Sequence, residues 1–280
     1  MKSSLWYIFI VIYSLAIFIL TLWRKRSTKL IAVYVLIGGA TYAFEYIVLV
    51  LLNSYVYSPG ILGNQYFDNI MGAVVSDGFS VPMMATFVAA YQLKYIYMLG
   101  LIGLLAGNEL LFLHLGIYKH YWWKEIYTVA GLLVAFSISK WWYKILQQPL
   151  SSVTRFITLF FANLLLEASV VFILSIFNKF FYTVDWFQDP ARGHVAFATI
   201  YVLVLSFLLA FLVTMRINWI WVSVALLSTI IPDVVLLKVG ILSMSNGWTF
   251  GHFIVLKFAD FVALLLLNNF LLGKPACTRP

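Results

Sequence analysis

The sequence predicts an all-α protein, a polytopic transmembrane helical bundle, because it has few charges and long apolar runs. Hydrophobic residues make up 64% of the 280 residues and charged residues 10%, whereas a typical soluble domain is about 25% charged. A chain with this few charged residues cannot form a polar, water-exposed surface of this size. We therefore expect the excess apolar surface to face lipid. The runs are too long, and alternate too little, to be strands of a membrane barrel.

About 20 apolar residues are needed to cross the roughly 30 Å hydrocarbon core of a bilayer. Unpaired backbone groups are too costly in lipid for open strands, so we expect each run to be a helix. We expect about nine helices, over residues 5–23, 30–52, 70–93, 96–118, 127–145, 155–177, 194–215, 218–240 and 251–272. The first run ends in Arg24-Lys25-Arg26 with no small-residue cleavage pattern, which favours a retained helix over a signal peptide.

Lysine and arginine predict the orientation. With the N-terminus outside, eleven of them fall in cytoplasmic junctions (Arg24, Lys25, Arg26, Lys29, Lys94, Lys140, Lys144, Arg155, Arg216, Lys274 and Arg279). Five fall in outer junctions (Lys2, Lys119, Lys124, Lys179 and Arg192), and Lys238 and Lys257 are assigned to spans. The positive-inside rule then places the C-terminus in the cytoplasm. Because the basic residues lie between apolar runs, the net charge of +8 indicates the lipid bilayer as partner and no nucleic acid.

The chain is also expected to contain a parallel 4+4 internal repeat. The matched pairs, at offsets of 121 to 125, are Glu45 with Glu167, Asp68 with Asp189, Glu109 with Asp233, His114 with Lys238, Gly116 with Gly240 and Trp123 with Trp248. Two units of four helices enter the membrane from the same side, which predicts a repeat axis along the membrane normal. The expected domains are the leading helix and basic junction, 1–29, the first unit, 30–150, and the second unit with its cytoplasmic tail, 151–280.

The first half of the chain resembles small polytopic membrane proteins of spore-forming Firmicutes, a group whose function is uncharacterised. The likeness covers about residues 5–145 and departs from that pattern where a second four-helix copy follows. It is carried by Arg24-Lys25-Arg26, Tyr57-Ser-Pro59, Phe67-Asp68, and Glu109 followed by Tyr118 and Trp122-Trp123. The resemblance implies a bacterial plasma-membrane protein and supplies no chemistry.

Six carboxyl groups fall inside the expected spans: Glu45, Asp77, Glu109, Glu167, Asp233 and Asp260. Each costs about 2.5–3.5 kcal/mol at a helix centre, so such residues usually face a bundle interior or a wet cavity. The two repeat-related pairs, Glu45 with Glu167 and Glu109 with Asp233, are expected to line one central cavity. Asp77 has no repeat partner and is given little weight. The alternative is that each acid only makes structural hydrogen bonds to a neighbouring helix.

Neighbouring residues refine this hypothesis. Gly107-Asn108 and Pro232 precede Glu109 and Asp233 and are expected to interrupt their helices, as in broken transporter helices. The basic residues His114 and Lys238 follow five positions later, on another face, and are expected to pair with another helix. Lys257 and Asp260 are three residues apart, which predicts a structural ion pair within one helix.

No other chemistry is indicated. The four histidines, His114, His120, His194 and His252, lack metal-ligand spacing, so no metal is expected. The single cysteine, Cys277, forms no framework. Nucleotide-binding and hydrolase motifs are absent, so we assign no cofactor and no catalytic residue.

Three functional hypotheses remain open. The first is a small-solute or cation transporter, with or without proton coupling, in which Glu109 and Asp233 are the coupling acids and Glu45 and Glu167 shape the site. The second is an intramembrane enzyme acting on a lipid or lipid-linked substrate. The third is a non-catalytic partner or scaffold subunit, bound to another membrane protein or to a second copy of this chain. An access route from lipid to the acids favours the enzyme.

Overall fold

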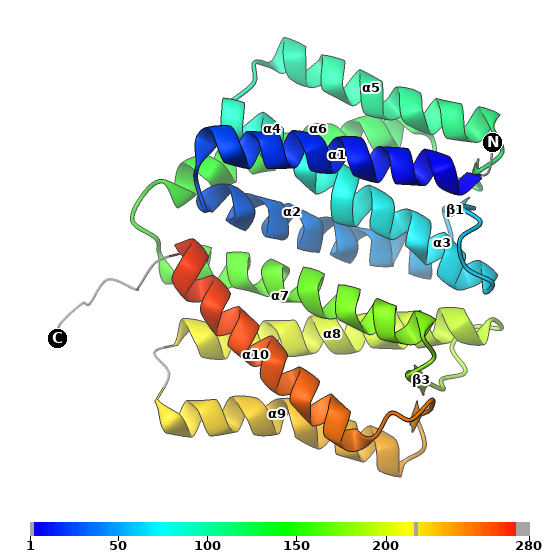
Figure 1. Cartoon of the computed structure of the whole chain (residues 1–280), viewed down its shortest axis with the longest axis vertical. Helices are drawn as coiled ribbons and strands as arrows, with labels where there is room; N and C mark the ends of the chain where they lie inside the picture. Colours follow the sequence, from blue (N-terminus) through cyan, green and yellow to red (C-terminus); the bar gives the residue numbers. More distant parts are fainter. Residues whose placement is uncertain (1–2, 216–217, 273–280) are drawn as a thin grey trace. The chain divides into compact units, whose positions relative to one another are not determined.

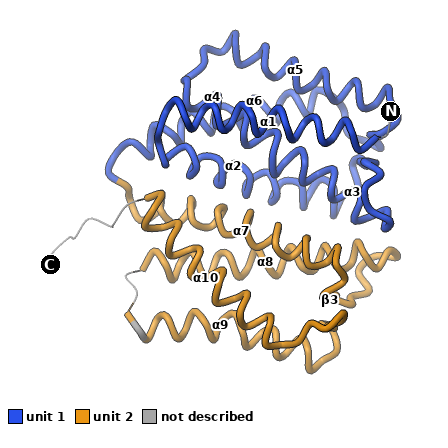
Figure 2. The backbone as a smooth tube through the Cα atoms, viewed as in Figure 1, with its two compact units in different colours: residues 1–149 blue, residues 150–280 orange. Residues whose placement is uncertain are grey.

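The computed structural model describes residues 3–215 and 218–272, and this part of the chain is mostly helical (Figure 1). Within it, nine helices are long and apolar enough to cross a membrane, and each expected range falls on one of them. The all-α prediction is therefore confirmed, and the chain fits a multi-pass membrane protein. Five residues named above lie outside the described residues: Lys2, Arg216, Lys274, Cys277 and Arg279. The chain divides into two compact units, Met1–Pro149 and Leu150–Pro280 (Figure 2).

Unit 1 contains five spans, two of which change helix type along their length. Its elements are α1 (Ser3–Lys25), α2 (Lys29–Glu45), the π-helical η1 (Tyr46–Leu51), β1 (Tyr55–Tyr57), α3 (Gln65–Ala73), the π-helical η2 (Val74–Ser80), α4 (Val81–Tyr91), α5 (Tyr95–His114), β2 (Tyr118–His120) and α6 (Glu125–Leu146). Helices α1, α2 and α6 all pack against α4. The fully buried Ala85 and Ala89 of α4 let these neighbours approach closely, as small residues do between membrane helices.

Unit 2 contains four spans. Its elements are α7 (Ser152–Ile176), β3 (Phe180–Tyr182), α8 (Pro190–Thr214), α9 (Trp219–Lys238), β4 (Leu242–Met244) and α10 (Phe250–Leu272). Helices α7 and α8 form the most extensive contact, and α10 packs against both. At the end opposite the strands, the buried Arg155 ties α7 to α10 by donating to Asn268 Oδ1 at 2.7 Å and to the carbonyl of Leu272 at 3.2 Å.

Each unit carries a short antiparallel strand pair outside its spans, a feature that hydropathy did not predict. Strand β1 pairs with β2 and β3 with β4, with Tyr57 opposite Tyr118 and Tyr182 opposite Leu242. Beyond the strands, Ser58 N donates to the Ile117 carbonyl at 2.9 Å and Thr183 N to the Ile241 carbonyl at 2.8 Å. These equivalent bonds lie 124 or 125 residues apart in the sequence.

A side chain from the following helix holds the first strand of each pair. Tyr57 N donates to Asn69 Oδ1 at 2.8 Å, and Tyr182 N donates to His194 Nδ1 at 2.9 Å, again at a spacing of 125. His194 is buried and also lies 2.7 Å from Ser175 Oγ. This histidine therefore supports the strand instead of lying in a solvated loop.

One sequence-based correspondence is wrong. Asp68 lies inside α3, where its carboxylate accepts from the backbone N–H groups of Gly60, Ile61 and Leu62 at 2.8–2.9 Å. Asp189 is instead the N-cap of α8 and accepts from Ala191 N at 2.9 Å. The matching cap in unit 1 is Asn64, which accepts from Phe67 N at the start of α3. The two aspartates thus stabilise different parts of the fold.

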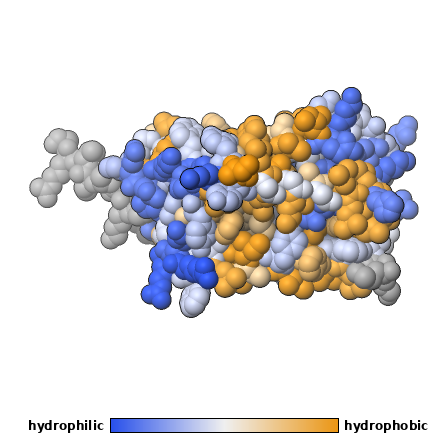
Figure 3. Space-filling view, turned by 90° about the horizontal axis from the view of Figure 1, so that it is seen from above, coloured by the Kyte–Doolittle hydropathy of each residue, from blue (hydrophilic) through white to orange (hydrophobic). Residues whose placement is uncertain are grey.

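The surface matches a chain surrounded by lipid. Large apolar side chains are exposed along the spans, including Phe9, Ile12 and Ile19 of α1. Figure 3 shows hydrophobic side chains gathered across the middle of the face in view, with hydrophilic ones toward its two ends. Such a surface is costly in water and suited to a bilayer.

Lys238 falls in a span, as expected, but it is the exposed last residue of α9 and so lies at the end of that span. At the strand-bearing ends of the units the described basic residues are Lys119, Lys124, Lys179, Arg192 and Lys238. At the opposite ends they are Arg24, Lys25, Arg26, Lys29, Lys94, Lys140, Lys144 and Arg155. The strand-free ends still carry more basic residues than the strand-bearing ends, although counting Lys238 at a strand-bearing end makes the difference smaller.

Substituting Gly72 is expected to destabilise unit 1. A Cβ atom at Gly72 would overlap the side chain of Tyr57, so Gly72→Ala should cost about 1–3 kcal/mol. Gly103 of α5 has open space around it, so Gly103→Ala should be neutral or stabilising by up to about 1 kcal/mol. Thermal unfolding in detergent measures both, and equal unfolding temperatures for the two variants would contradict the packing of β1 on α3.

Candidate functional site

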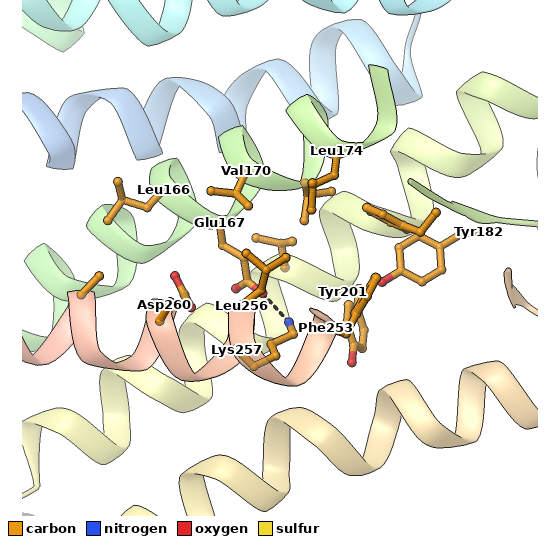
Figure 4. Close-up of a pocket in the computed structure, with 15 residues that line it drawn as sticks. Leu166, Glu167, Val170, Leu174, Tyr182, Tyr201, Phe253, Leu256, Lys257 and Asp260 are labelled. Atoms are coloured by element: carbon orange, nitrogen blue, oxygen red, sulfur yellow. Dashed lines mark hydrogen bonds and ion pairs between the residues drawn. The ribbon is translucent and has the colours of Figure 1, made fainter. Parts of the chain in front are cut away.

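All four helices of unit 2 contribute polar side chains to one buried cluster. Figure 4 shows Glu167 from α7, Tyr201 from α8, and Lys257 and Asp260 from α10 around the cluster's cavity. Asp233 of α9 joins the cluster through Tyr201. Glu167 lies nine residues before the end of α7, about 14 Å along the helix, so the cluster is far from either end of the span.

The centre of the cluster is an ion pair between α10 and α7. Lys257 Nζ donates to Glu167 Oε1 at 2.6 Å, and the two residues are only 9% and 5% exposed. The predicted intrahelical pair of Lys257 with Asp260 is therefore wrong: no ion pair joins them among the described residues. The long lysine side chain crosses the helix interface instead of turning back along its own helix.

Asp233 is held by a tyrosine. The Tyr201 hydroxyl donates to Asp233 Oδ1 at 2.5 Å, and Asp233 is 1% exposed. Pro232 does not interrupt α9, which runs from Trp219 to Lys238, and α5 likewise continues through Gly107 and Asn108. Asn108 instead donates to the Tyr13 hydroxyl of α1 at 3.1 Å. The expectation of broken helices beside these acids is therefore wrong.

The third acid of the cluster is incompletely bonded. Asp260 Oδ2 is buried and has no hydrogen-bond partner among the described residues, and the same is true of Asn163 Oδ1. Asn163 lies beside Asp260, and its Nδ2 atom donates to Ser206 Oγ at 3.1 Å and to Glu167 Oε2 at 3.3 Å. Buried polar atoms without a partner are rare, so Asp260 and Asn163 leave this side of the cluster incompletely hydrogen-bonded.

A cavity of about 240 Å³ adjoins these groups. Its walls are apolar and aromatic, with Leu166, Leu174 and Leu256 alongside Phe180, Tyr182 and Phe253. Two lining residues, Val170 of α7 and Ala259 of α10, are exposed and lie within their spans. The cavity therefore opens between α7 and α10, within the length of these helices.

The charges of the cluster do not balance. Three carboxyl groups, those of Glu167, Asp233 and Asp260, surround the single ammonium group of Lys257. Burial disfavours an ionised carboxylate strongly unless it is paired. Additional positive charge, from protons or from a bound cation, would therefore stabilise the cluster.

Unit 1 holds the other acids in contacts of its own. The Tyr55 hydroxyl donates to Glu45 Oε2 at 2.5 Å, and Glu109 Oε1 lies 2.8 Å from His120 Nε2. Burial raises the pKa of Tyr55 well above its ordinary value, so its hydroxyl stays protonated and can donate. All the contacts described for the six acids lie within one unit, and a cavity shared by Glu45, Glu109, Glu167 and Asp233 stays a prediction.

The two basic candidates lie outside these contacts. His114 and Lys238 are the exposed last residues of α5 and α9, and neither joins the bonds of the acids described here. Helix spacing correctly separated them from Glu109 and Asp233. They lie at the ends of their spans, where a charge is cheap to solvate.

The partners of the acids were not predicted from the sequence. Tyr55 lies 10 residues from Glu45 and Tyr201 lies 32 residues from Asp233, whereas Asn163 lies one helical turn before Glu167 in α7. Asp77 was given little weight. One signal was available: tyrosines alternate in Tyr55-Val-Tyr57, and Tyr118 and His120 alternate in the same way, which is the spacing of a strand with one face toward a site. The π-helical segments beside Glu45 and around Asp77 had no sequence signal.

Removing Lys257 should destabilise unit 2. Lys257→Met leaves the Glu167 carboxylate buried without its ammonium, at a cost of about 3–5 kcal/mol. The double variant Glu167→Gln/Lys257→Met removes both charges and should recover most of that loss. Unfolding in detergent measures all three proteins, and an additive double variant would show that the pair is not energetically coupled.

No family, curated protein or solved structure matches the chain in comparisons with known proteins.

Proposed function

We propose that this chain is a membrane transporter that exchanges protons for a small organic cation at the unit 2 cluster. The observation that carries the proposal is the charge imbalance, three buried carboxyl groups around one lysine beside a cavity. Carboxyl groups in such sites bind protons or cations by turns, because one positive charge suffices to neutralise each of them.

The walls of the cavity favour an organic cation over a hydrated metal ion. Aromatic faces attract ammonium groups, and Lys257 Nζ already lies 5.4 Å from the centre of the Tyr201 ring. The leucine and phenylalanine walls suit the apolar body of such a ligand. Among the described residues, no three His, Cys, Asp or Glu side chains lie close enough together to hold a metal ion.

The proposed exchange rests on competition. A monovalent cation that enters the cavity replaces one proton held by Asp260 or Asp233, and its release allows that proton to return. Lys257 keeps Glu167 neutralised throughout, so the exchange involves the two remaining acids. The cluster then never carries a large uncompensated charge within the membrane.

We also propose that the chain contains an internal duplication and has a defined orientation in the membrane. The equivalent strand registers, glycine turns at Gly116 and Gly240, and helices α5 and α9 of identical length support an internal duplication at an offset of 124–125. The basic residues at the strand-free ends support an N-terminus outside and a C-terminus in the cytoplasm. The bacterial plasma membrane is proposed from the Firmicutes resemblance.

A second candidate is an enzyme that acts on a lipid or lipid-linked substrate. The observation in its favour is the cavity mouth between α7 and α10, where exposed Val170 and Ala259 lie within the spans. An amphiphile in the bilayer reaches such a mouth without passing through water. The chemistry would fall to Asp260 and Tyr201, the groups nearest the cavity that can exchange a proton.

Transport is tested with purified protein in liposomes that contain a pH-sensitive dye. Tetramethylammonium added outside should drive proton release from the lumen, because the ion carries a permanent charge and cannot cross as a neutral amine. Asp260→Asn removes one charged contact worth about 1.5–3 kcal/mol, so exchange should fall about tenfold or more. The matched control is Asp185→Asn, in an exposed loop of unit 2, which should exchange at the wild-type rate.

Equal proton release from protein-free liposomes, or full activity of Asp260→Asn, would contradict the proposal. The enzyme candidate is separated from transport by incubating the protein with a bacterial lipid extract and analysing the products by mass spectrometry. A new lipid product that disappears in Asp260→Asn, without any cation flux, would establish the second candidate in its place.

A further inference from the structure

Unit 1 contains a second pair of acids, the buried Glu45 and the partly buried Asp77, at the points where two of its spans become π-helical. Glu45 is the last residue of α2 before η1, and Asp77 lies within η2. π-Helical turns are rare and occur often at functional sites. Side chains of α2 bond the carbonyls of η2: Thr41 Oγ1 donates to the Asp77 carbonyl at 2.9 Å and the Tyr34 hydroxyl to the Gly78 carbonyl at 2.8 Å.

The carboxyl group of Glu45 is only half bonded. Its Oε2 atom accepts from the Tyr55 hydroxyl at 2.5 Å. Its Oε1 atom is buried and has no hydrogen-bond partner among the described residues, and the residue as a whole is only 7% exposed. This carboxylate oxygen therefore has neither a hydrogen-bond donor among these residues nor solvent to stabilise a negative charge.

Asp77 and several tyrosines face the same space. Asp77 lies within electrostatic range of Glu45, and both acids influence Tyr55 and Tyr57 of β1. Tyr118 of β2 also lies within electrostatic range of both acids, and Glu109 acts on Tyr118 from α5. The hydroxyl groups of Tyr34 and Tyr42, both from α2, lie beside Gly78, the residue after Asp77. The groups that face the pair are therefore acids and tyrosines.

A neutralising cation is missing from this environment. Within the described residues, no ion pair includes Glu45 or Asp77. Helices α1, α2 and α6 carry their basic residues at the strand-free end, and Lys29 is 16 residues from Glu45, about 24 Å along the helix. Two ionised carboxylates in this setting would repel each other in a low dielectric with nothing to offset the cost.

We infer that Glu45 and Asp77 form a proton-binding site that holds at least one proton at neutral pH and exchanges it with the strand-bearing side of unit 1. The ligand is a proton and not a metal ion, because no group of three or more metal-ligating side chains occurs in the described part of the chain. One proton taken up removes one negative charge from the pair, and no other reactant is needed. This site is independent of the cation exchange proposed for unit 2.

The contacts suggest the route. Tyr55 bonds Glu45 directly and its ring lies 5.3 Å from that of Tyr118, which also stacks on Tyr57 at 4.6 Å. The ring of Tyr118 lies 5.0 Å from that of His120, which is partly exposed and bonded to Glu109. Aromatic ring contacts thus lead from Tyr55, which bonds Glu45, through Tyr118 to a histidine in β2. Burial raises the pKa of Tyr57 and Tyr118, so these hydroxyls remain protonated links.

Infrared spectroscopy of the full-length protein tests the site, because a protonated carboxyl group has its own C=O stretching band. At neutral pH, Glu45→Gln and Asp77→Asn should each remove or shift the same component of this band. Asp185→Asn, which changes an exposed carboxyl group in a loop of unit 2, should leave the band unchanged. Asp260→Asn should leave the Glu45 component in place, so the result stands whether or not unit 2 exchanges cations.

A band that is identical in wild type, Glu45→Gln and Asp77→Asn would overturn the proposal. If either variant fails to fold, Tyr55→Phe provides the second test: loss of its hydrogen bond should move the Glu45 component to higher frequency, and an unmoved band would likewise overturn the proposal. For the route, Tyr118→Phe should slow the exchange of this proton for deuterium. Tyr97→Phe, at an exposed position of α5, should exchange at the wild-type rate, and equal rates in both variants would exclude the route through Tyr118.

Discussion

The cost of an unpaired carboxylate in a low-dielectric interior is the constraint on which both clusters depend. Each buried acid needs a cation, a proton or hydrogen-bond donors, because solvent is absent. Unit 2 meets this need partly with Lys257, whose ammonium neutralises Glu167. Unit 1 meets it with donors alone, through Tyr55 at Glu45 and His120 at Glu109. The remaining acidity in both units has no fixed cation, and that remainder gives each cluster its proposed capacity to bind positive charge.

The two units place different chemistry on similar scaffolds. Helices α6 and α10 begin at Glu125 and Phe250, and at this spacing of 125 Lys257 corresponds to the buried Leu132. Unit 1 therefore has an apolar side chain where unit 2 has the buried lysine of its acid cluster. An internal lysine suits a site that must stay nearly neutral as a larger cation enters and leaves, whereas a lysine-free acid pair suits the binding of protons. Two units of similar architecture in this way carry two separate proposed functions.

The strand pairs connect the acids to the ends of the spans. The strand residues Tyr55, Tyr57 and Tyr118 lie close to the acids of unit 1, and Tyr182 lines the cavity of unit 2. Backbone pairing satisfies the strands' own polar groups, and Asn69 and His194 hold them from the following helices. A rigid strand fixes a hydroxyl more precisely than a flexible loop, which matters where a single donor stabilises a buried carboxylate. The short strands between the spans thus contribute side chains to both candidate sites.

The sequence by itself determined the nine spans, their approximate ends and the six acids within them, because the cost of placing a residue in lipid is a local property of its side chain. It also matched Glu109 with Asp233, which occupy equivalent positions in helices of equal length. Only the tertiary structure decided the partners: Lys257 reaches Glu167 on another helix and not Asp260 three residues away, and Asp77 faces Glu45. It also decided where the helices deviate, beside Glu45 and Asp77 and not at Pro232. A side chain's partner depends on which helices pack together and how they are rotated, and hydropathy carries no information about that rotation.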